Sequence, residues 1–349
     1  MIYSTSAYSA QVFRNGDSMF YLKRQGASAL LGIAVMLGVS RLDYRILLKP
    51  LPILNIKSVT LAYFGAILLQ AAVFIPGLGV EYNGAKRWLK LGPVQFQPSD
   101  ISKVAVILFV AYIIYTAPKR MDKLTGFIRV ALYMSPLIVL ILVENMSTAI
   151  VVCGIMVGIS FVGSRKKWYY FVAMFFMLLA GAAFILFGEG FRLQRIQIWL
   201  DVENHEKGFQ ILQGLYAIAS GGLTGTGLGG SMQKLGYVPE AQNDMIFAII
   251  CEELGLFGAV TVILLFVLLI WRLFIISINA PDMFGGLMCT GILVHIAVQV
   301  VINIAVVTNS IPSTGIPLPF ISYGGTSVAV LLAEMGLALS VSNQIKYER

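Results

Sequence analysis

The sequence predicts an all-α, polytopic integral membrane protein built as a bundle of spanning helices. Of its 349 residues, 58% are hydrophobic and only 12% are charged, whereas soluble domains have roughly 45–50% apolar and about 25% charged residues. Apolar runs recur along the chain at lengths near the ~20 residues with which a helix crosses a bilayer. In lipid the backbone must bond within one segment or in a closed barrel, and these runs are too long for barrel strands. We therefore exclude a soluble globular domain.

Nine apolar runs are predicted to span the membrane. They lie at residues 26–40, 58–76, 101–117, 126–143, 147–163, 168–187, 245–273, 284–308 and 325–342. One alternating set of the connections between them is rich in Lys and Arg, including Lys119, Arg120 and Lys123. Short cytoplasmic connections have this composition. We therefore assign this set and the C-terminus to the cytoplasm.

The opposite set of connections is predicted to form extracytoplasmic loops. These loops lie at residues 77–100, 188–244 and 309–324, and we expect residues 1–349 to form one transmembrane domain. Nine spans with a cytoplasmic C-terminus place the N-terminus outside, although residues 1–25 contain no signal peptide. Residues 1–8 are therefore interpreted as the outer end of a further helix that this chain lacks.

Charge and cysteine content narrow the classes of partner. The formal net charge is +8, but the Lys and Arg residues lie in short loops without a basic face, so no nucleic-acid partner is expected. The outer loops still carry more Lys and Arg than expected, which fits either a lipid-linked phosphate substrate or solvated loop charge. Cys153, Cys251 and Cys289 are far apart in apolar segments, which indicates neither a disulfide framework nor a zinc site.

The first outer loop contains a cationic and aromatic motif followed by a helix start. Lys86 and Arg87 could hold a diphosphate group, while Trp88 packs against a sugar or the headgroup layer. Interfacial anchoring alone is the alternative. Asp100 suits the first turn of a helix, with Lys103 one turn further on.

The second outer loop contains a glycine-rich segment in which Gly225, Gly227 and Gly230 match the pattern GxGxxG. A dinucleotide site would require a preceding strand and a soluble βαβ unit, and neither is predicted here. We therefore reject that interpretation and predict a flexible loop.

Asp244 stands at the mouth of the apolar run at 245–273. Partial desolvation of a carboxylate at that depth should raise its pKa toward the range of a general base. The alternative is an ordinary aspartate at a helix N-terminus, where the helix dipole favours it.

Glutamates at membrane depth are costly and usually face a bundle interior or a cavity. Those found in or beside the apolar runs are Glu144, Glu252, Glu253 and Glu334. They could form a proton or substrate path, or they could be interfacial residues or buried partners of Lys103 and Arg272. We favour the second interpretation for Glu252 and Glu253.

The last outer segment, residues 313–327, carries two prolines and paired glycines that break the helix. Irregular backbone at membrane depth persists only where it is buried in protein or lines a wet cavity. The segment therefore either borders a site, to which it offers hydroxyl and amide groups, or is a plain outer turn.

Three segments together resemble the signature segments of the FtsW, RodA and SpoVE (SEDS) family. They run from Asn83 to Lys103, from Gly225 to Gly255 and from Pro312 to Ser327, and the similarity extends from Met1 to the C-terminus. Ile2–Thr5 and Phe20–Gln25 resemble the family's first outer loop, which follows a first helix. The family has ten spans, so nine predicted spans agree with a missing first helix.

The resemblance implies a peptidoglycan glycosyltransferase. Such an enzyme polymerises lipid II on the outer face of the bacterial cytoplasmic membrane and releases undecaprenyl diphosphate. The family's essential acid corresponds to Asp244, which is implied as the catalytic base and as a ligand of a divalent cation, Mg or Mn; no organic cofactor is implied. The implied substrate-binding residues are Lys86, Arg87, Trp88, Lys103, Glu240, Ser322 and Tyr323.

The implied partners are a class B penicillin-binding protein and other proteins of a division or elongation complex, with division or sporulation favoured. The sequence also departs from the family pattern. Gln242 and Asn243 stand where His and Thr are usual, Asp100 stands where Glu is usual, and Glu144–Thr148 replaces a Pro-Asp-x-Gly-Thr segment. Two other functions stay open, namely a flippase or transporter for the same lipid and a scaffold without chemistry.

Overall fold

The computed structural model describes residues 1–14, 16–52, 55–82, 85–92, 94–186, 190–205 and 208–346. Its elements, in chain order, are α1 (Ile2–Phe13), α2 (Phe20–Arg41), η1 (Tyr44–Leu48), α3 (Ser58–Ala72), β1 (Gly79–Tyr82), β2 (Ala85–Leu91), β3 (Val94–Phe96), α4 (Pro98–Thr116), η2 (Pro118–Asp122), α5 (Leu124–Glu144), α6 (Met146–Gly163), α7 (Trp168–Leu186), α8 (Gly190–Leu200), α9 (Phe209–Gly221), α10 (Ile246–Ile278), α11 (Met283–Val307) and α12 (Gly325–Ser342).

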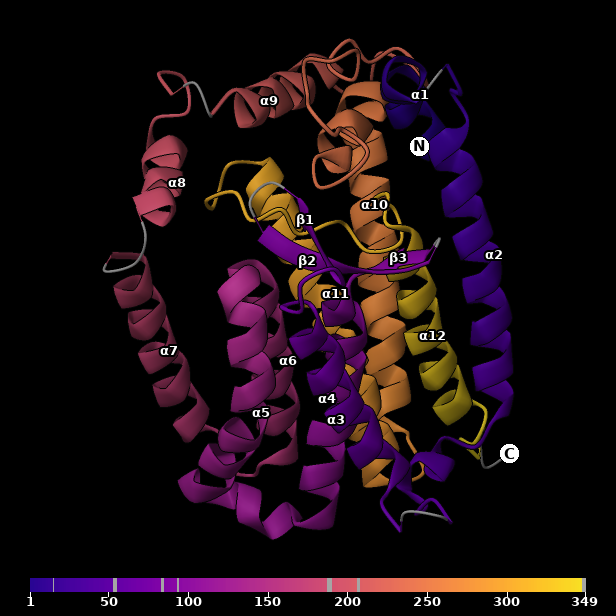
Figure 1. Cartoon of the computed structure of the whole chain (residues 1–349), viewed down its shortest axis with the longest axis vertical. Helices are drawn as coiled ribbons and strands as arrows, with labels where there is room; N and C mark the ends of the chain where they lie inside the picture. The colour runs from indigo at the N-terminus through magenta and orange to yellow at the C-terminus, as the bar shows by residue number, and fades with distance from the viewer. Residues whose placement is uncertain are drawn as a thin grey trace. The chain divides into compact units, whose positions relative to one another are not determined.

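The predicted helical membrane bundle is confirmed. Each predicted apolar run coincides with a helix, namely α2, α3, α4, α5, α6, α7, α10, α11 and α12 (Figure 1). Among the described residues, six helices are long and apolar enough to cross a membrane: α4, α5, α6, α10, α11 and α12. The helix α3 is apolar but shorter. The chain is therefore a multi-pass membrane protein, and the number of nine spans stays a prediction.

Local sequence signals fix where several helices begin and end. Pro98 occupies the first turn of α4, where its missing N–H is not needed, and Asp100 follows it. Asn145 ends α5 and caps α6, because its side-chain oxygen accepts the Thr148 N–H at 3.1 Å. The helix α2 begins at Phe20, so the residues that we expected in an outer loop form its first turns.

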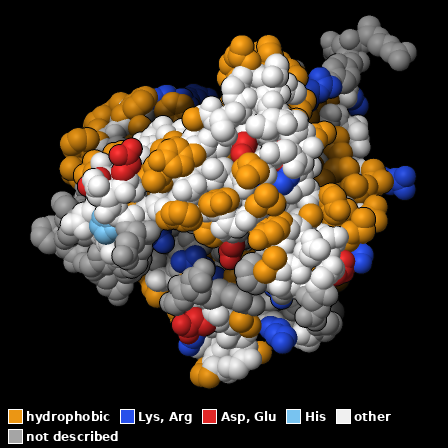
Figure 2. All heavy atoms as spheres, turned by 90° about the horizontal axis from the view of Figure 1, so that it is seen from above, with side chains coloured by type: hydrophobic (Ala, Val, Ile, Leu, Met, Phe, Trp, Pro, Cys, Tyr) orange, Lys and Arg blue, Asp and Glu red, His pale blue; other side chains and the backbone are white. Residues whose placement is uncertain are grey.

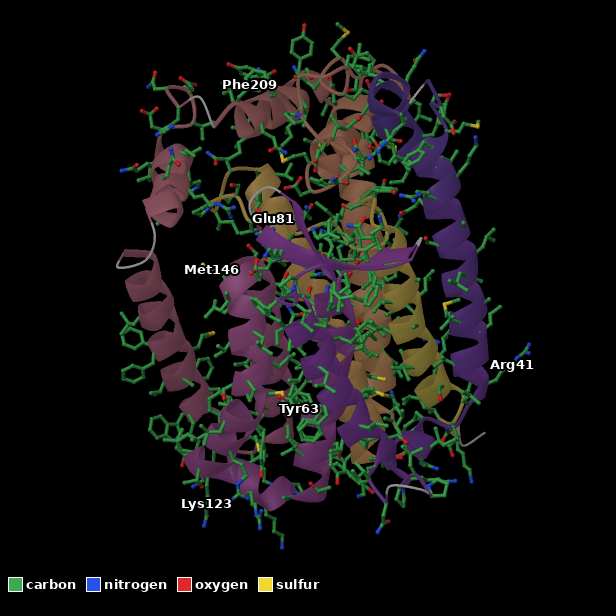
Figure 3. All side chains as sticks on the ribbon, viewed as in Figure 1. Arg41, Tyr63, Glu81, Lys123, Met146 and Phe209 are labelled. Atoms are coloured by element: carbon green, nitrogen blue, oxygen red, sulfur yellow. The ribbon has the colours of Figure 1, made fainter. Side chains whose placement is uncertain are left out.

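The described structure divides into two compact units. Unit 1 comprises residues 1–27, 171–269 and 299–325, and unit 2 comprises residues 28–170, 270–298 and 326–349. In unit 2, the helices α3 to α6 pack side by side (Figure 1). The Tyr63 side chain of α3 lies within this bundle (Figure 3), and its ring stacks on the Phe109 ring with 4.3 Å between the centroids.

The first predicted outer loop forms a small antiparallel sheet in unit 2, with strand order β1-β2-β3. Val80 pairs with Trp88 across β1 and β2, and Leu89 pairs with Phe96 across β2 and β3. The strand β2 lies against α4 and α5. Leu89 is buried while its neighbour Lys90 is exposed, which is the alternation of a half-buried strand. We had expected a loop here, so these strands are an addition to the predicted all-α fold.

The second predicted outer loop contains the helices α8 and α9 in unit 1, followed by the glycine-rich segment. A helix rather than a strand precedes that segment, which agrees with the rejection of a dinucleotide site. The segment is also bonded to α10, since the Thr226 and Gly227 N–H groups donate to the Glu252 and Glu253 carbonyls at 2.9 and 3.0 Å. It is an attached segment, and the interpretation as a flexible loop is not supported.

The surface around this segment is largely apolar. Leu223, Leu228 and Met232 of unit 1 are all more than half exposed. Figure 2 shows hydrophobic side chains widespread over the face seen from above, with charged side chains scattered among them. Such a surface suits a membrane interface or a protein partner better than open water.

Candidate active site

Asp244 lies half-buried just before α10, and its carbonyl is bonded to α11 of unit 1. The Asn303 side-chain amide of α11 donates to the Asp244 carbonyl at 2.7 Å and to the Ile316 carbonyl at 2.8 Å. Asn303 is fully buried. One amide therefore fixes the start of α10 and the last outer segment against α11.

The last outer segment makes further bonds to the residues that precede Asp244. The Ser322 hydroxyl donates to the Asn243 carbonyl at 2.7 Å and accepts the Leu318 N–H at 2.8 Å. The Tyr323 N–H donates to the Gln242 carbonyl at 2.8 Å. Of the predicted substrate-binding residues, Ser322 and Tyr323 therefore lie in the segment bonded to the catalytic candidate. The hypothesis of a plain outer turn does not account for these bonds.

Gly315 of the same segment lies beside the Asp244 carboxylate. A Cβ built on Gly315 would lie 3.8 Å from Asp244 Oδ2, and the backbone φ of Gly315 is +67°. A Cβ at that distance would be in ordinary van der Waals contact, so a glycine suits this position for its backbone conformation.

The first turns of α2 complete this region. The Gln25 side chain donates to the Ser322 carbonyl and accepts the Gly324 N–H, each at 3.1 Å. The Tyr21 and Tyr323 rings meet edge to face with 4.8 Å between their centroids. Burial raises the pKa of Tyr323, while the neighbouring Arg24 guanidinium opposes that rise.

The electrostatics of Asp244 match the predicted direction. Burial raises the pKa of the Asp244 carboxyl from its ordinary 3.8 to about 6; the negative charge of Glu240 adds to the rise and the Arg195 guanidinium opposes it. Glu240 also accepts the Asn243 side-chain amide at 2.7 Å, and Arg195 donates to the Ser313 carbonyl at 3.2 Å. At neutral pH the carboxyl is therefore mostly ionised, yet basic enough to accept a proton.

The oxygen atoms near Asp244 suit a hard divalent cation. No group of three or more His, Cys, Asp or Glu side chains occurs among the described residues. Around Asp244, however, four buried side-chain oxygens have no hydrogen-bond partner, namely Gln242 Oε1, Asn243 Oδ1, Asn303 Oδ1 and Thr314 Oγ1. Buried oxygens of this kind usually bind water or an ion. Like the Asp244 carboxylate they are oxygen donors, which is the type of ligand that Mg²⁺ and Mn²⁺ prefer.

The other predicted residues belong to unit 2. The exposed Lys86 and the half-buried Arg87 lie on β2 with Trp88. The Lys86 N–H donates to the Glu144 carboxylate and the Arg87 Nε–H donates to the Glu144 carbonyl, both at 2.8 Å. Glu144 therefore fastens the sheet to the end of α5. The Asn83 and Gly84 that open this motif lie outside the described residues.

Lys103 forms a buried ion pair with Asp100 on the first turns of α4. The Lys103 Nζ and Asp100 Oδ1 atoms are 2.9 Å apart, and the two side chains are 5% and 11% exposed. This pair corrects the expected partnership of Lys103 with a glutamate of α10.

The glutamates of α10 and α12 have other partners than those predicted. Glu252 accepts the Met232 N–H at 2.9 Å and also the Ser231 hydroxyl. Glu253 pairs with Lys234, with 2.6 Å between Nζ and Oε1. In unit 2, Glu334 of α12 pairs with His295 of α11 at 2.8 Å. The interpretation of Glu252 and Glu253 as partners of Lys103 and Arg272 is therefore wrong.

Sequence reasoning missed Gln25 and Asn303. Both are buried polar side chains that bind main-chain groups of the last outer segment. A signal was present for Asn303, which lies within the apolar run at 284–308, because a polar amide there is costly in a membrane unless it has partners. Gln25 lies just before the run at 26–40 and carried no such signal.

The fold and this site define the class of protein: a multi-pass helical membrane protein in which segments of unit 1 hold a half-buried carboxylate at the start of a long apolar helix. The model of the cell cycle protein family FtsW/RodA/SpoVE matches residues 1–347. The chain belongs to this family, as the three signature segments predicted.

Curated relatives and solved structures agree with this assignment. The stage V sporulation protein E of Bacillus subtilis (strain 168) is 37% identical over 99% of this chain and 93% of its own length. A probable peptidoglycan glycosyltransferase FtsW of Geobacter sp. (strain M18) is 35% identical over the same shares.

Among solved structures, a chain from a study of polymerization and crosslinking by a peptidoglycan synthase complex has a TM-score of 0.80 and 26% identity, covering 99% of this chain and 96% of that one. A mutant of the rod shape determining protein RodA of Thermus thermophilus has a TM-score of 0.67 and 25% identity, covering 99% and 95%. The predicted family and helical fold are therefore confirmed.

Proposed function

We propose that this protein is a peptidoglycan glycosyltransferase that polymerises lipid II into glycan strands at the outer face of the bacterial cytoplasmic membrane. The observation that carries the proposal is Asp244, a half-buried carboxyl whose pKa is raised to about 6 and whose backbone is braced by Asn303. Relatives that match 99% of the chain bear the name of this activity.

In this mechanism Asp244 is the general base. Its carboxylate accepts the proton of the acceptor GlcNAc hydroxyl as that oxygen attacks the anomeric carbon of the donor chain. The new glycosidic C–O bond forms while the bond from the anomeric carbon to the diphosphate oxygen breaks. Undecaprenyl diphosphate leaves with the electron pair of that bond, and the proton stays on Asp244 until solvent removes it.

The departing diphosphate gains negative charge and needs nearby cations. Lys86 and Arg87 supply positive charge for it, and Trp88 offers an apolar face to a sugar ring or lipid headgroup. Lys103, charged but held by Asp100, serves as a fixed cation. Charge-assisted bonds of this kind are stronger than neutral ones, which favours them for diphosphate.

The residues around the base orient the sugars. The Tyr323 hydroxyl and the Glu240 carboxylate offer hydrogen bonds to sugar hydroxyl and amide groups, while the buried Ser322 hydroxyl, bonded to Asn243 and Leu318, holds this segment in place. A divalent cation, Mg²⁺ or Mn²⁺, would be held by Asp244 with the side-chain oxygens of Asn303 and Thr314. Such an ion stabilises negative charge that develops on phosphate oxygens. Placement of donor and acceptor accounts for much of the remaining acceleration.

The orientation in the membrane follows from the connections of unit 2. In Figure 3, Lys123 lies at one end of this unit and Glu81 of β1 lies at the other. The exposed Lys119, Arg120 and Lys123 suit a cytoplasmic surface. The sheet end of unit 2 is then extracytoplasmic, and the C-terminus is cytoplasmic. The alternation of the predicted spans along the sequence assigns residues 188–244 and 309–324, and with them the active site, to the extracytoplasmic side.

The partner in this proposal is a class B penicillin-binding protein that crosslinks the new strands, within a division, sporulation or elongation complex. The support is the likeness to a chain from the peptidoglycan synthase complex. The exposed apolar side chains of the second outer loop offer a surface for such contacts.

The test is polymerisation of labelled lipid II by the purified full chain together with a class B penicillin-binding protein. We expect glycan strands from the wild type and none from Asp244→Ala. The matched control is Asp201→Ala, because Asp201 is an exposed aspartate of the same outer loop. An active Asp244→Ala variant would exclude the catalytic role. Movement of lipid II across vesicles without polymer would favour a flippase, and neither activity would favour a scaffold.

A further inference from the structure

A buried ion pair that the reaction does not use joins three distant segments of unit 1. Lys234 Nζ and Glu253 Oε1 are 2.6 Å apart, and their side chains are 8% and 0% exposed. The Ser4 hydroxyl of α1 donates to the same Glu253 oxygen at 2.6 Å, and Lys234 Nζ lies 3.0 Å from Ser4 Oγ. The pair therefore connects α1, the glycine-rich segment and α10, and Figure 1 shows α1 beside the upper part of α10.

The pair sits where the α10 backbone is broken. Gly255 has φ 64° and ψ −164° inside the helix, a conformation that only glycine adopts readily. At the break, a backbone group of α10 bonds to the glycine-rich segment: the Leu256 N–H donates to the Gly222 carbonyl at 2.9 Å. A Cβ on Gly225 would overlap the Glu253 carbonyl, so the two backbones are in direct contact.

The side chains of both glutamates strengthen the same attachment. Glu252 accepts the Met232 N–H at 2.9 Å and the Ser231 hydroxyl, while Glu253 holds Lys234. We call residues 222–243 the catalytic strap. The strap is bonded to α10 around Glu252 and Glu253 and rejoins it at Asp244.

This geometry links the ion pair to the base. Asp244 and Glu252 are eight positions apart in the sequence, which corresponds to roughly 12 Å along a helix. The strap spans that distance and carries Glu240 and Asn243 directly before Asp244. The point of attachment of the strap on α10 therefore determines how the last residues of the strap orient the Asp244 carboxylate.

Stability alone does not explain charge at this position. A buried ion pair is often no more stabilising than well-packed apolar residues of similar size, but it demands a defined geometry. Here the defined contact fixes the register of the strap on α10, and its third member, Ser4, belongs to α1. An apolar pair would supply no such directional contact.

We propose that Lys234 and Glu253 are positioning residues that hold the catalytic strap on α10 and thereby place Asp244 for proton transfer. This proposal adds a positioning contact to the proposed glycosyltransferase, and its kinetic test rests on that proposed function. It assigns to Ser4 the role of joining α1 to the same contact.

The kinetic test compares Glu253→Gln, Lys234→Met and the double variant in lipid II polymerisation. We expect each single change to lower kcat at least about tenfold, while KM changes less than about twofold, because the base is misplaced and substrate binding is not. The double variant should be no slower than the slower single variant, since the two residues act as one unit. Lys23→Met is the matched control, because Lys23 pairs with Asp17 at the surface. Additive losses, or single variants within about twofold of the wild type, would overturn the proposal.

Hydrogen exchange supplies a readout that needs no activity. In Glu253→Gln, the strap amides that bond to α10, such as those of Thr226 and Gly227, should exchange at least about tenfold faster, with α4 and α11 unchanged. Faster exchange throughout the chain, or none in the strap, would contradict a positioning role. If the wild type makes no polymer, the proposed function fails, while this measurement still decides whether the pair holds the strap.

Discussion

Replacing Asp244 with asparagine should stabilise the folded protein at neutral pH while it abolishes the reaction. Burial raises the pKa of the Asp244 carboxyl from 3.8 to about 6, so the folded state binds this proton more tightly than the unfolded state does. Since one unit of pKa corresponds to about 1.4 kcal/mol, the ionised carboxylate costs the fold about 3 kcal/mol above pH 6. A neutral asparagine of similar shape avoids that cost at every pH.

The pH dependence gives the sign of this effect. Below pH 3.8 the carboxyl is protonated in both states, and the wild type then has no penalty. The penalty grows between pH 4 and 6 and is complete above the folded pKa of about 6. The stability gained by Asp244→Asn should therefore be largest near pH 8 and should shrink as the pH falls toward 4.

Thermal unfolding of the purified protein in detergent, at pH 5 and at pH 8, measures this difference. At pH 8 we expect Asp244→Asn to unfold a few °C above the wild type, with a smaller gap at pH 5. The exposed Asp201→Asn serves as the control and should shift neither curve. An equal gap at both pH values, or a less stable variant at pH 8, would refute the desolvation argument for Asp244.

Three further predictions concern neighbouring features. The midpoint of the pH–rate profile should fall in Glu240→Gln and rise in Arg195→Gln, because the first charge raises the pKa of Asp244 and the second lowers it; unchanged midpoints would mean that another group titrates. Lys103→Met should lower the free energy of unfolding by about 3–5 kcal/mol in a denaturant titration, since it leaves Asp100 buried without its partner. Gly255→Ala should cost at least about 1–3 kcal/mol in the same titration, because alanine is strained at φ 64° and its Cβ would also overlap the backbone of Leu223 and Gly225. The open helical Gly65→Ala should instead stabilise by about 0.5–1 kcal/mol.

The membrane helices could be predicted from sequence because hydropathy over about 20 residues reflects a single dominant cost, the exposure of polar groups to lipid. The runs at 101–117 and 126–143 correspond closely to α4 and α5. The first outer sheet was missed because strands as short as Val94–Phe96 carry too few residues for a clear alternating pattern. The break at Gly255 was missed because a single glycine within an apolar run rarely interrupts a membrane helix.

Some residues of the candidate site could be predicted from the sequence, and others could not. Asp244 could be proposed from its place at the edge of an apolar run, and the bonds of Ser322 and Tyr323 beside it agree with their place in a helix-breaking segment. The partners of Glu253 could not be predicted, because Ser4 and Lys234 reach it through tertiary packing that no local pattern encodes.

The central claim is that Asp244 takes the proton of the attacking sugar hydroxyl. The most direct measurement is single-turnover polymerisation of lipid II by the wild type and Asp244→Asn, followed between pH 5 and pH 8. The wild-type rate should rise about fivefold between pH 5 and its midpoint near pH 6, about double again above it and then level off, and the folded Asp244→Asn variant should make no glycan at any pH. A variant that polymerises, or a wild-type rate that does not change across this range, would contradict the account.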